Sequence, residues 1–286
     1  MGYATARERR ALARLAVDAG RAVTLAAVAA IVLAFFASGV LQLAIEVRAQ
    51  ENLSLGTIFP SVDAVRGAWE AHQGRLLEEH IPETLWETLA GLAIATVLGV
   101  TIAALMDFSR VLRWLLYPLL VVSQTIPIFA IAILLILIFG FGSGPKITVV
   151  VLFCFFPVAL NTFSGLQSAD PELLSLLRAM GASARQVWMK ARLPAAMPSF
   201  FAGLRIAATY SVVGAIFGEY ITAQRGLGVF LKRSYSSFRL DQAYLAILLT
   251  ALLSLLLVLL VTLVERLALR WYYTSRRTSW RGPGIY

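Results

Sequence analysis

Long uncharged stretches alternate with short polar segments along this chain. Six of the stretches are apolar and long enough for membrane helices, since a helix crosses the hydrocarbon layer with about 20 residues. They cover residues 22–45, 88–106, 114–145, 147–169, 193–204 continuing after Arg205 through 206–218, and 242–264. The third stretch exceeds one crossing, so we expect kinks at Pro118 and Pro127 and a glycine-rich turn ending at Pro145. The pattern predicts an all-α membrane protein with six transmembrane helices.

Composition agrees with a membrane protein. The 286 residues are 59% hydrophobic and only 14% charged, and the mean hydropathy is +0.78. A pI near 10.1 would suit a nucleic-acid-binding protein, but most basic residues flank apolar runs, which indicates a lipid bilayer and no nucleic acid partner. Placing the larger share of Lys and Arg on the cytoplasmic side predicts that both termini are cytoplasmic.

These spans define the expected domains. They are a cytoplasmic tail (1–21), a first transmembrane helix (22–46), an external connection (47–83), a transmembrane domain (84–271) and a cytoplasmic tail (272–286). In the external connection, Val62, Val65, Trp69 and Leu76 follow Ser61 at helical spacing. This spacing predicts an amphipathic helix at the outer surface.

Residues 170–194 read as a polar helical hairpin between two spans. Asp170 is a suitable cap for a helix starting at Pro171, and Gly181 suits the left-handed position after its end. Ser183 and Gln186 have the spacing of a capping box for a second helix. The sequence therefore predicts two short helices separated by a glycine break.

This hairpin is unusually apolar for a segment outside the membrane. Leu173, Leu177 and Met180 form an i, i+4, i+7 stripe, and Pro194 is expected to end the second helix. The stripe either packs onto this chain's own helix ends or binds a separate soluble protein. Both interpretations remain open at this point.

Two rows of small residues recur every fourth position in the second and fifth spans. Such rows let helix backbones approach closely in lipid. The rows are Gly91, Ala95, Gly99 and Ala103, and Gly203, Ala207, Ser211 and Ala215.

Several polar side chains fall within the apolar runs. Glu219 continues the second small-residue row, and it either lines an aqueous pathway or lies at the outer end of its span near Arg225. Arg205 is expected to reach toward lipid phosphate. Interhelical hydrogen bonds and a translocation path are both consistent with the remaining polar groups. The path candidates are Gln124, Thr125, Asn161, Thr162, Ser211 and Glu219.

The sequence offers no catalytic or metal-binding motif. The single cysteine, Cys154, permits no intrachain disulfide. His72 and His80 do not have the i, i+4 spacing of a helical ligand pair, so we predict no metal site. The glycine-rich segment 140–146 lacks the Gly-Lys-Ser/Thr ending of a phosphate loop. We therefore expect no enzyme activity and no bound cofactor.

At the hairpin the sequence resembles the inner-membrane permease subunits of bacterial ABC importers. Their hallmark is Glu-Ala-Ala, three residues, Gly, and a Leu-Pro pair thirteen residues after that Gly. Gly181 and Leu193-Pro194 keep this spacing, whereas 175–177 read Ser-Leu-Leu, with Glu172 as the substitute for the missing glutamate. The resemblance covers roughly residues 85–271.

This resemblance implies a type I importer permease fold. Two permeases, expected to be identical, would form the pathway, two cytoplasmic ATPases would hydrolyse ATP, and an external binding protein would deliver substrate. The resemblance makes the hairpin the ATPase-coupling element. The coupling candidates are Glu172, Leu173, Ser175, Leu177, Arg178, Met180, Gly181, Ala182, Ser183, Leu193 and Pro194.

Other segments resemble one branch of these permeases. Segments 124–127, 139–146 and 161–166 look like the branch for sulfonates, taurine, nitrate and pyrimidine-type vitamin precursors. Segments 213–220 and 225–228 look closest to permeases for the thiamine pyrimidine precursor or riboflavin. A sulfonate permease remains the alternative, and an ion-coupled secondary transporter is the alternative from another class.

Overall fold

A computed structural model describes residues 60–140, 142–222 and 224–272. The chain divides into two units, Met1–Pro60 and Ser61–Tyr286, and all described residues except Pro60 belong to the second. The predicted N-terminal tail, the first transmembrane helix, the start of the external connection and all but the first residue of the C-terminal tail lie outside the described residues. Across the part that is described, all regular structure is helical.

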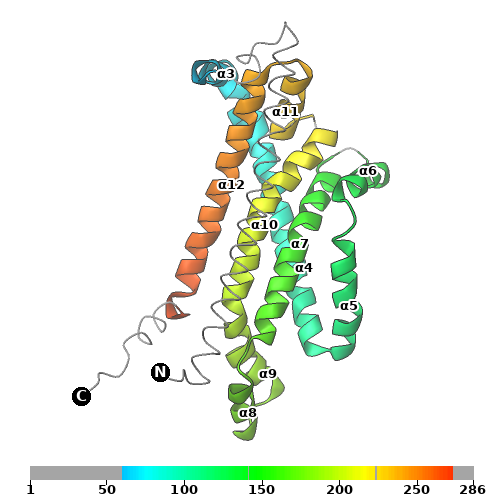
Figure 1. Cartoon of the computed structure of the whole chain (residues 1–286), viewed down its shortest axis with the longest axis vertical. Coiled ribbons are helices and arrows are strands. Elements are labelled where there is room, and N and C mark those ends of the chain that lie inside the picture. The colour runs from blue at the N-terminus through cyan, green and yellow to red at the C-terminus, as the bar shows by residue number, and fades with distance from the viewer. Residues whose placement is uncertain (1–59, 141, 223, 273–286) are drawn as a thin grey trace, which may run out of the picture. The chain divides into compact units, whose positions relative to one another are not determined.

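The helices follow one another along the chain as shown in Figure 1. They are α3 (Val62–Arg75), η1 (a π-helix, Leu76–His80), α4 (Ile81–Phe108), α5 (Arg110–Ser123), α6 (Ile128–Phe139), α7 (Ser143–Gln167), α8 (Pro171–Ala179), α9 (Ala184–Val187), η2 (a π-helix, Trp188–Arg192), α10 (Leu193–Thr222), α11 (Leu227–Ser236) and α12 (Leu240–Ala268). Within the second unit, α8 and α9 lie at one end, the hairpin end, and α3 and α11 lie at the other, the distal end.

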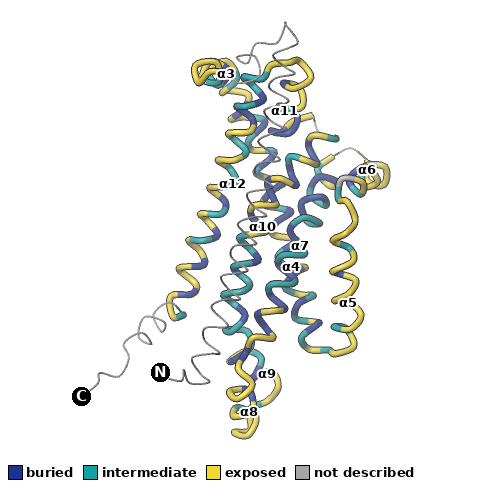
Figure 2. The backbone as a smooth tube through the Cα atoms, viewed as in Figure 1, coloured by how far each residue is buried: buried dark blue, intermediate teal, exposed yellow. Residues whose placement is uncertain are grey.

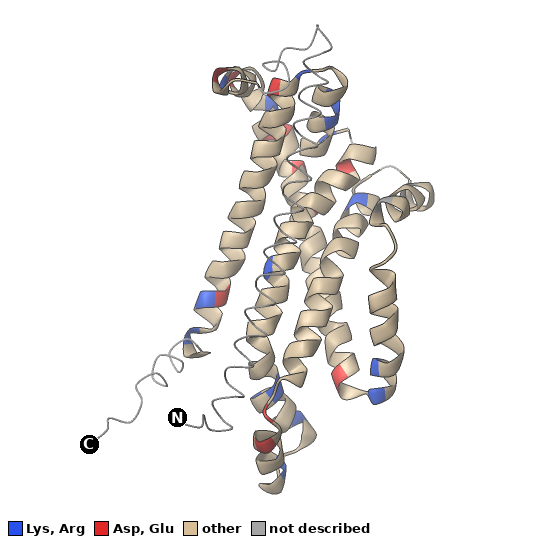
Figure 3. Ribbon diagram, viewed as in Figure 1, with Lys and Arg blue, Asp and Glu red and all other residues tan. Residues whose placement is uncertain are grey.

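Four described segments are long and apolar enough to cross a membrane. They are Val62–Phe108, Ser143–Gln167, Ala184–Ile221 and Leu240–Ala268. These segments contain the predicted second, fifth and sixth spans and all but the last two residues of the fourth. The charged residues of the described bundle gather mainly toward its two ends, as Figure 3 shows.

The third apolar stretch, for which kinks at Pro118 and Pro127 were expected, is interrupted at the second of these prolines. Residues 124–127 divide it into α5 and the short helix α6. Pro127 explains the break, because proline lacks an N–H and disfavours the helical conformation in the preceding residue. Pro118, by contrast, lies inside α5. The following turn also ends earlier than predicted, since α7 begins at Ser143 and includes Pro145.

Helices α4, α7 and α10 form the buried centre of the second unit, and Figure 2 shows buried positions along all three. The small-residue rows lie at these contacts, as predicted. A Cβ added at Gly91 would lie 2.4 Å from a Val150 methyl group, and one at Gly203 would lie 2.5 Å from the Pro157 carbonyl oxygen. Both glycines are therefore required for the helices to approach this closely.

The predicted amphipathic helix is α3. Ser61 caps it by accepting a hydrogen bond from the Ala64 N–H (3.2 Å). Its buried residue Ala68 packs with Leu76 of η1 against α11 and α12, in an apolar cluster with Val65 and Trp69 at its edge. The cluster consists of Ala68, Leu76, Leu227, Phe230, Leu245 and Ala246.

Candidate functional site

The α8–α9 hairpin is built by the capping residues that its sequence predicts. Asp170 accepts a hydrogen bond from the Glu172 N–H (2.9 Å), and Ser183 and Gln186 form a reciprocal capping box. Gly181 adopts φ +83°, and the N–H of Ala182 donates to the carbonyl of Leu177 (3.0 Å). This Schellman ending stops α8 and turns the chain sharply into α9.

Pro194 does not end the second hairpin helix, contrary to prediction. It occupies the second position of α10, and the helical path runs on from α9 through η2 into α10. Proline is tolerated in this first turn because η2 precedes it as a π-helix, whose wider hydrogen-bonding pattern can accommodate the missing N–H. The hairpin is therefore continuous with a segment of 38 residues, Ala184–Ile221, roughly 57 Å long at about 1.5 Å per residue.

The apolar stripe of the hairpin divides between two faces. Leu174 is buried against Val187 and Ala191, with Leu177 packed at the edge of this cluster. Leu173 is 45% exposed and Met180 is 75% exposed. Packing within the chain thus accounts for one face only.

The base of the hairpin is fixed to α4 by Asp107. Its buried carboxylate forms an ion pair with Arg192 of η2 and accepts hydrogen bonds from Trp188 Nε1 (3.1 Å) and Gln167 Nε2 (2.6 Å). The ring of Phe108 stacks on Trp188 at 5.2 Å between centroids. One side chain therefore joins α4, α7 and the hairpin. In the sequence, Asp107 is a lone acid at the end of an apolar run, and our sequence analysis did not identify its role.

Glu219 lies in a polar network at the distal end. The Thr84 hydroxyl donates to one of its carboxylate oxygens (2.5 Å), and the Gly228 N–H donates to the other (2.6 Å). Thr84 also accepts a hydrogen bond from the Leu227 N–H (2.9 Å). Glu219 is fully buried, and no ion pair joins it to Arg225 among the described residues. The carboxylate thus ties α10 to α4 and to the start of α11.

Three further ion pairs, formed by two basic residues, were missed by the sequence analysis. Lys146 of α7 pairs with Glu83 (3.1 Å) and Glu87 of α4, where the two acids are one helical turn apart. Arg205 pairs with Glu265 and so links α10 to α12. The expectation that Arg205 reaches toward lipid phosphate is therefore wrong, because a carboxylate on the neighbouring helix already accepts its hydrogen bond.

The structure separates the path candidates into two groups. Gln124 and Thr125 line a half-open pocket between the α5–α6 break and α7, together with Pro127, Val149, Phe153 and Phe217. The rings of Phe153 and Phe217 stack there at 6.0 Å between centroids.

The other path candidates lie within helix contacts. Asn161 donates to the Pro157 carbonyl (2.8 Å), and Ser211 donates to the Ala208 carbonyl (2.8 Å). Thr162 is buried, and its hydroxyl has no hydrogen-bond partner among the described residues. The structure therefore does not bring these three side chains into the pocket that contains Gln124 and Thr125.

Solved structures with the same fold are ABC importers. A methionine ABC transporter, MetNI, in an inward-facing conformation aligns with a TM-score of 0.61 at 21% identity, covering 69% of this chain and 97% of that chain. An amino acid ABC transporter with histidines aligns with a TM-score of 0.58 at 18% identity, covering 70% and 96%. The architecture is thus that of a type I ABC importer permease, as predicted.

Sequence comparison narrows this class to a family. Residues 95–271 match the family described as "Binding-protein-dependent transport system inner membrane component". This match covers more than half of the 286 residues, and the chain belongs to that family.

Relatives in sequence include permeases that are named for different substrates. The formylaminopyrimidine transport permease ThiX of Halalkalibacterium halodurans is 38% identical over 67% of this chain and 77% of its own length. The riboflavin transport permease RibX of Chloroflexus aurantiacus is 33% identical over 75% of this chain and 80% of its own length. The putative aliphatic sulfonates permease SsuC of Escherichia coli is 32% identical over 75% and 82%.

The chain is therefore a multi-pass inner-membrane permease of an ABC importer for small solutes. Permeases of this family have no ATPase site of their own and work with ATPase subunits and a substrate-binding protein. Because the chain belongs to this family, the alternative of an ion-coupled secondary transporter is excluded.

Proposed function

We propose that two copies of this permease form the path for a small planar heterocycle, of the formylaminopyrimidine or riboflavin type. Cytoplasmic ATPases dock on the α8–α9 hairpins and hydrolyse ATP, and a binding protein delivers substrate at the distal end. Both termini then lie in the cytoplasm, and the outer sides of the helices contact lipid. A sulfonate is the alternative substrate, because relatives for all three substrate types match at similar coverage.

The exposed apolar face of the hairpin is the observation that carries the coupling proposal. Leu173 and Leu176 are exposed on the nine-residue helix α8, and Met180 is exposed directly after its end, whereas the other face of the helix is already packed. Exposed apolar side chains on such a projection favour burial by a protein partner, at about 25 cal/mol per Å². Glu172, Ser175, Arg178 and Ser183 supply a polar rim around this surface.

The hairpin also has a direct route for transmitting movement. The helical path from Ser183 through η2 into α10 is continuous, so a displaced hairpin would carry the hairpin end of α10 with it. Asp107 would transmit the same displacement to α4. Since α4 and α10 both pack on α7, these contacts support a rigid-body mechanism for opening the path.

The coupling proposal is tested by the double variant Met180→Glu/Gly181→Glu in the reconstituted importer. Substrate-stimulated ATP hydrolysis should be abolished while membrane insertion is unchanged. Val62→Glu is the matched control, because Val62 is also exposed, at 84%, but lies at the distal end in the first turn of α3. Unchanged transport in the double variant would refute ATPase docking on this hairpin.

The pocket beside the α5–α6 break supports the substrate proposal. Phe153 and Phe217 present aromatic rings, and the amide of Gln124 and the hydroxyl of Thr125 lie in the same pocket. Aromatic rings stack on planar heterocycles, with about 0.5–1.5 kcal/mol beyond area burial. Asn161, Thr162, Ser211 and Glu219 would join the path only in a conformation in which α7 and α10 separate.

Uptake by the Phe217→Ala and Phe217→Tyr variants distinguishes the substrate classes. For a heterocycle, Phe217→Ala should reduce the rate of formylaminopyrimidine or riboflavin uptake about tenfold, and Phe217→Tyr should preserve it. Transport of an aliphatic sulfonate by the wild-type importer, with neither heterocycle transported, would establish the alternative substrate.

A further inference from the structure

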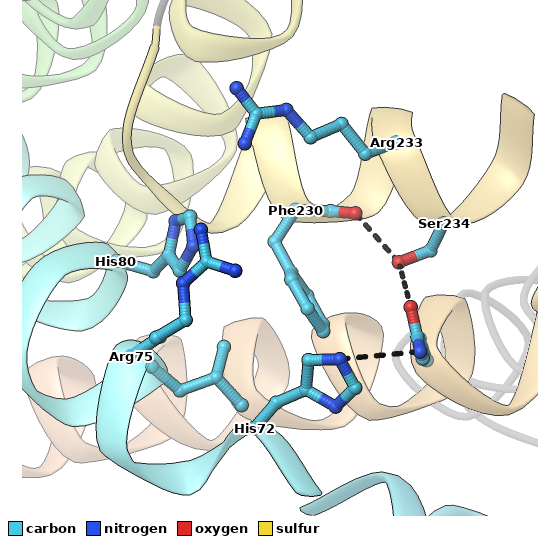
Figure 4. A pocket seen from close by; sticks show the side chains of 8 residues that line it. His72, Arg75, His80, Phe230, Arg233 and Ser234 are labelled. Atoms are coloured by element: carbon cyan, nitrogen blue, oxygen red, sulfur yellow. Dashed lines mark hydrogen bonds between the residues drawn. The ribbon is translucent and has the colours of Figure 1, made fainter. Parts of the chain in front are cut away.

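The distal end contains a basic pocket that the proposed transport mechanism does not use. Three segments line it: α3 with the following η1, α11, and the start of α12. Its lining residues are His72, Arg75, Leu76, His80, Phe230, Arg233, Ser234 and Gln242. Figure 4 shows Arg75 and Arg233 extending on the same side of the Phe230 ring as His80.

The polar groups on the His72 side of the pocket already have partners. His72 Nδ1 donates to the Ala68 carbonyl (3.0 Å), and Gln242 Nε2 donates to His72 Nε2 (3.4 Å). Ser234 donates to the Phe230 carbonyl (2.7 Å). This side therefore forms a fixed wall, which offers few groups to a ligand.

The opposite side of the pocket presents the two guanidinium groups. His80 Nδ1 lies 2.9 Å from the Gly226 carbonyl oxygen and 3.1 Å from the Gly226 nitrogen, so the backbone of Gly226 already engages this ring nitrogen. Among the described residues, no ion pair joins Arg75 or Arg233 to a carboxylate. Within the described part of the chain, Arg233 forms one hydrogen bond, to the Gln224 carbonyl (3.4 Å), and Arg75 forms none.

We propose that this pocket binds a tetrahedral oxyanion, a phosphate or sulfonate group held between the guanidinium groups of Arg75 and Arg233. Guanidinium presents paired N–H groups that match two oxygens of such an anion. Two guanidinium groups that face the same pocket repel each other, and a bound anion removes that repulsion. The anion is either free in solution or the phosphate of a lipid head group, since both present the same oxygens.

Thermal unfolding of the purified full chain tests the site. In detergent, inorganic phosphate at a concentration 100-fold above its Kd should raise Tm by about 5 °C relative to chloride at equal ionic strength. A second arm compares the Tm of the protein in nanodiscs of phosphatidylglycerol with its Tm in nanodiscs of phosphatidylcholine. A response in the detergent arm identifies a free anion, and a response in the lipid arm alone identifies a head group.

Matched variants distinguish anion binding in the pocket from a general effect of positive charge at the distal end. Arg75→Gln/Arg233→Gln should lose the response. Arg66→Gln/Arg239→Gln removes the same two charges from the distal end outside the pocket and should keep it. Arg75→Lys/Arg233→Lys should respond more weakly, because lysine cannot bind an oxyanion through paired donors.

Three results would overturn the proposal. These are no response in either arm, an equal response in the pocket and control variants, and loss of binding-protein association in the pocket variant while its anion response is intact. The last result would assign the two arginines to a protein carboxylate. None of the three depends on the transport proposal, because every arm measures binding or stability without ATPase subunits.

Discussion

Trp188 Nε1 donates a hydrogen bond to the carboxylate of Asp107 (3.1 Å) across the junction between the hairpin and the bundle. Trp188 opens the π-helical segment η2, and the same carboxylate pairs with Arg192 at the end of that segment. Single π-helical turns occur frequently at functional sites. Here the wide turn holds two side chains that bind one buried acid, so the hairpin cannot tilt without disturbing α4.

Removing the Asp107 charge should weaken the coupling between substrate delivery and ATP hydrolysis. In Asp107→Asn, Arg192 loses its counter-charge, and we expect the protein to be destabilised by about 3 kcal/mol. Substrate-stimulated ATP hydrolysis should fall more strongly than basal hydrolysis. Thermal unfolding and ATPase assays with and without loaded binding protein measure the two effects separately.

The double variant Asp107→Asn/Arg192→Met distinguishes an effect on stability from an effect on coupling. It should regain part of the stability lost in Asp107→Asn, because it no longer holds a partly buried cation without a counter-charge. Coupling should remain low, since the link between α4 and η2 is still absent. Recovery of both properties together would contradict a mechanical role for Asp107.

Close helix contact makes Gly203 intolerant of a side chain. A Cβ at this position would lie 2.5 Å from the Pro157 carbonyl oxygen and 2.7 Å from Asn161 Cβ. Gly203→Ala should therefore push α10 away from α7 and lower the free energy of unfolding by about 1–3 kcal/mol. Gly67→Ala is the control: the added Cβ meets nothing within 4 Å, and it should be neutral or stabilising by up to about 1 kcal/mol. Similar Tm values for the two variants would argue against the steric explanation.

Local rules predicted the hairpin because its structure depends on neighbours in sequence. Asp170, Gly181 and Ser183 act on backbone groups within a few residues, so spacing alone identified their roles. The small-residue rows were equally readable, since helical periodicity places them on one face. Pro194 was misread because the position of a proline within a helix depends on where that helix begins.

The long-range polar partners were not predictable in the same way. Asp107 and Arg192 are 85 residues apart, and Thr84 and Glu219 are 135 apart. Each acid was visible in the sequence as an unusual residue near the end of an apolar run. Its partner was not visible, because pairing depends on which helices pack together. The same limit explains why Arg205 was assigned to lipid when Glu265 binds it.

The left-handed conformation of Gly181 predicts a graded response to substitution. At φ +83°, a side chain with a Cβ costs about 1–2 kcal/mol, and asparagine tolerates this region better than a β-branched residue. Gly181→Val should therefore distort the turn between α8 and α9 and reduce coupled ATP hydrolysis, whereas Gly181→Asn should retain most of it. Equal activity of the two variants would show that the turn is not required in its present conformation.

The network around Glu219 predicts a strong coupling between two distant residues. Glu219 accepts from Thr84 and from the Gly228 N–H, and all these groups are buried. In Glu219→Gln the side-chain amide can accept only through its oxygen, so either the Thr84 hydroxyl or the Gly228 N–H faces an NH₂ group. We expect the free energy of unfolding to fall by about 2–3 kcal/mol, because a buried donor left unsatisfied retains its desolvation cost.

Thr84→Val should lower the free energy of unfolding by a similar amount, because the Leu227 N–H loses its acceptor. Thermal unfolding of the single and double variants then gives the interaction energy, which should exceed about 0.5 kcal/mol for residues in direct contact. Strictly additive losses would mean that the two side chains stabilise the distal end independently, despite the hydrogen bond between them.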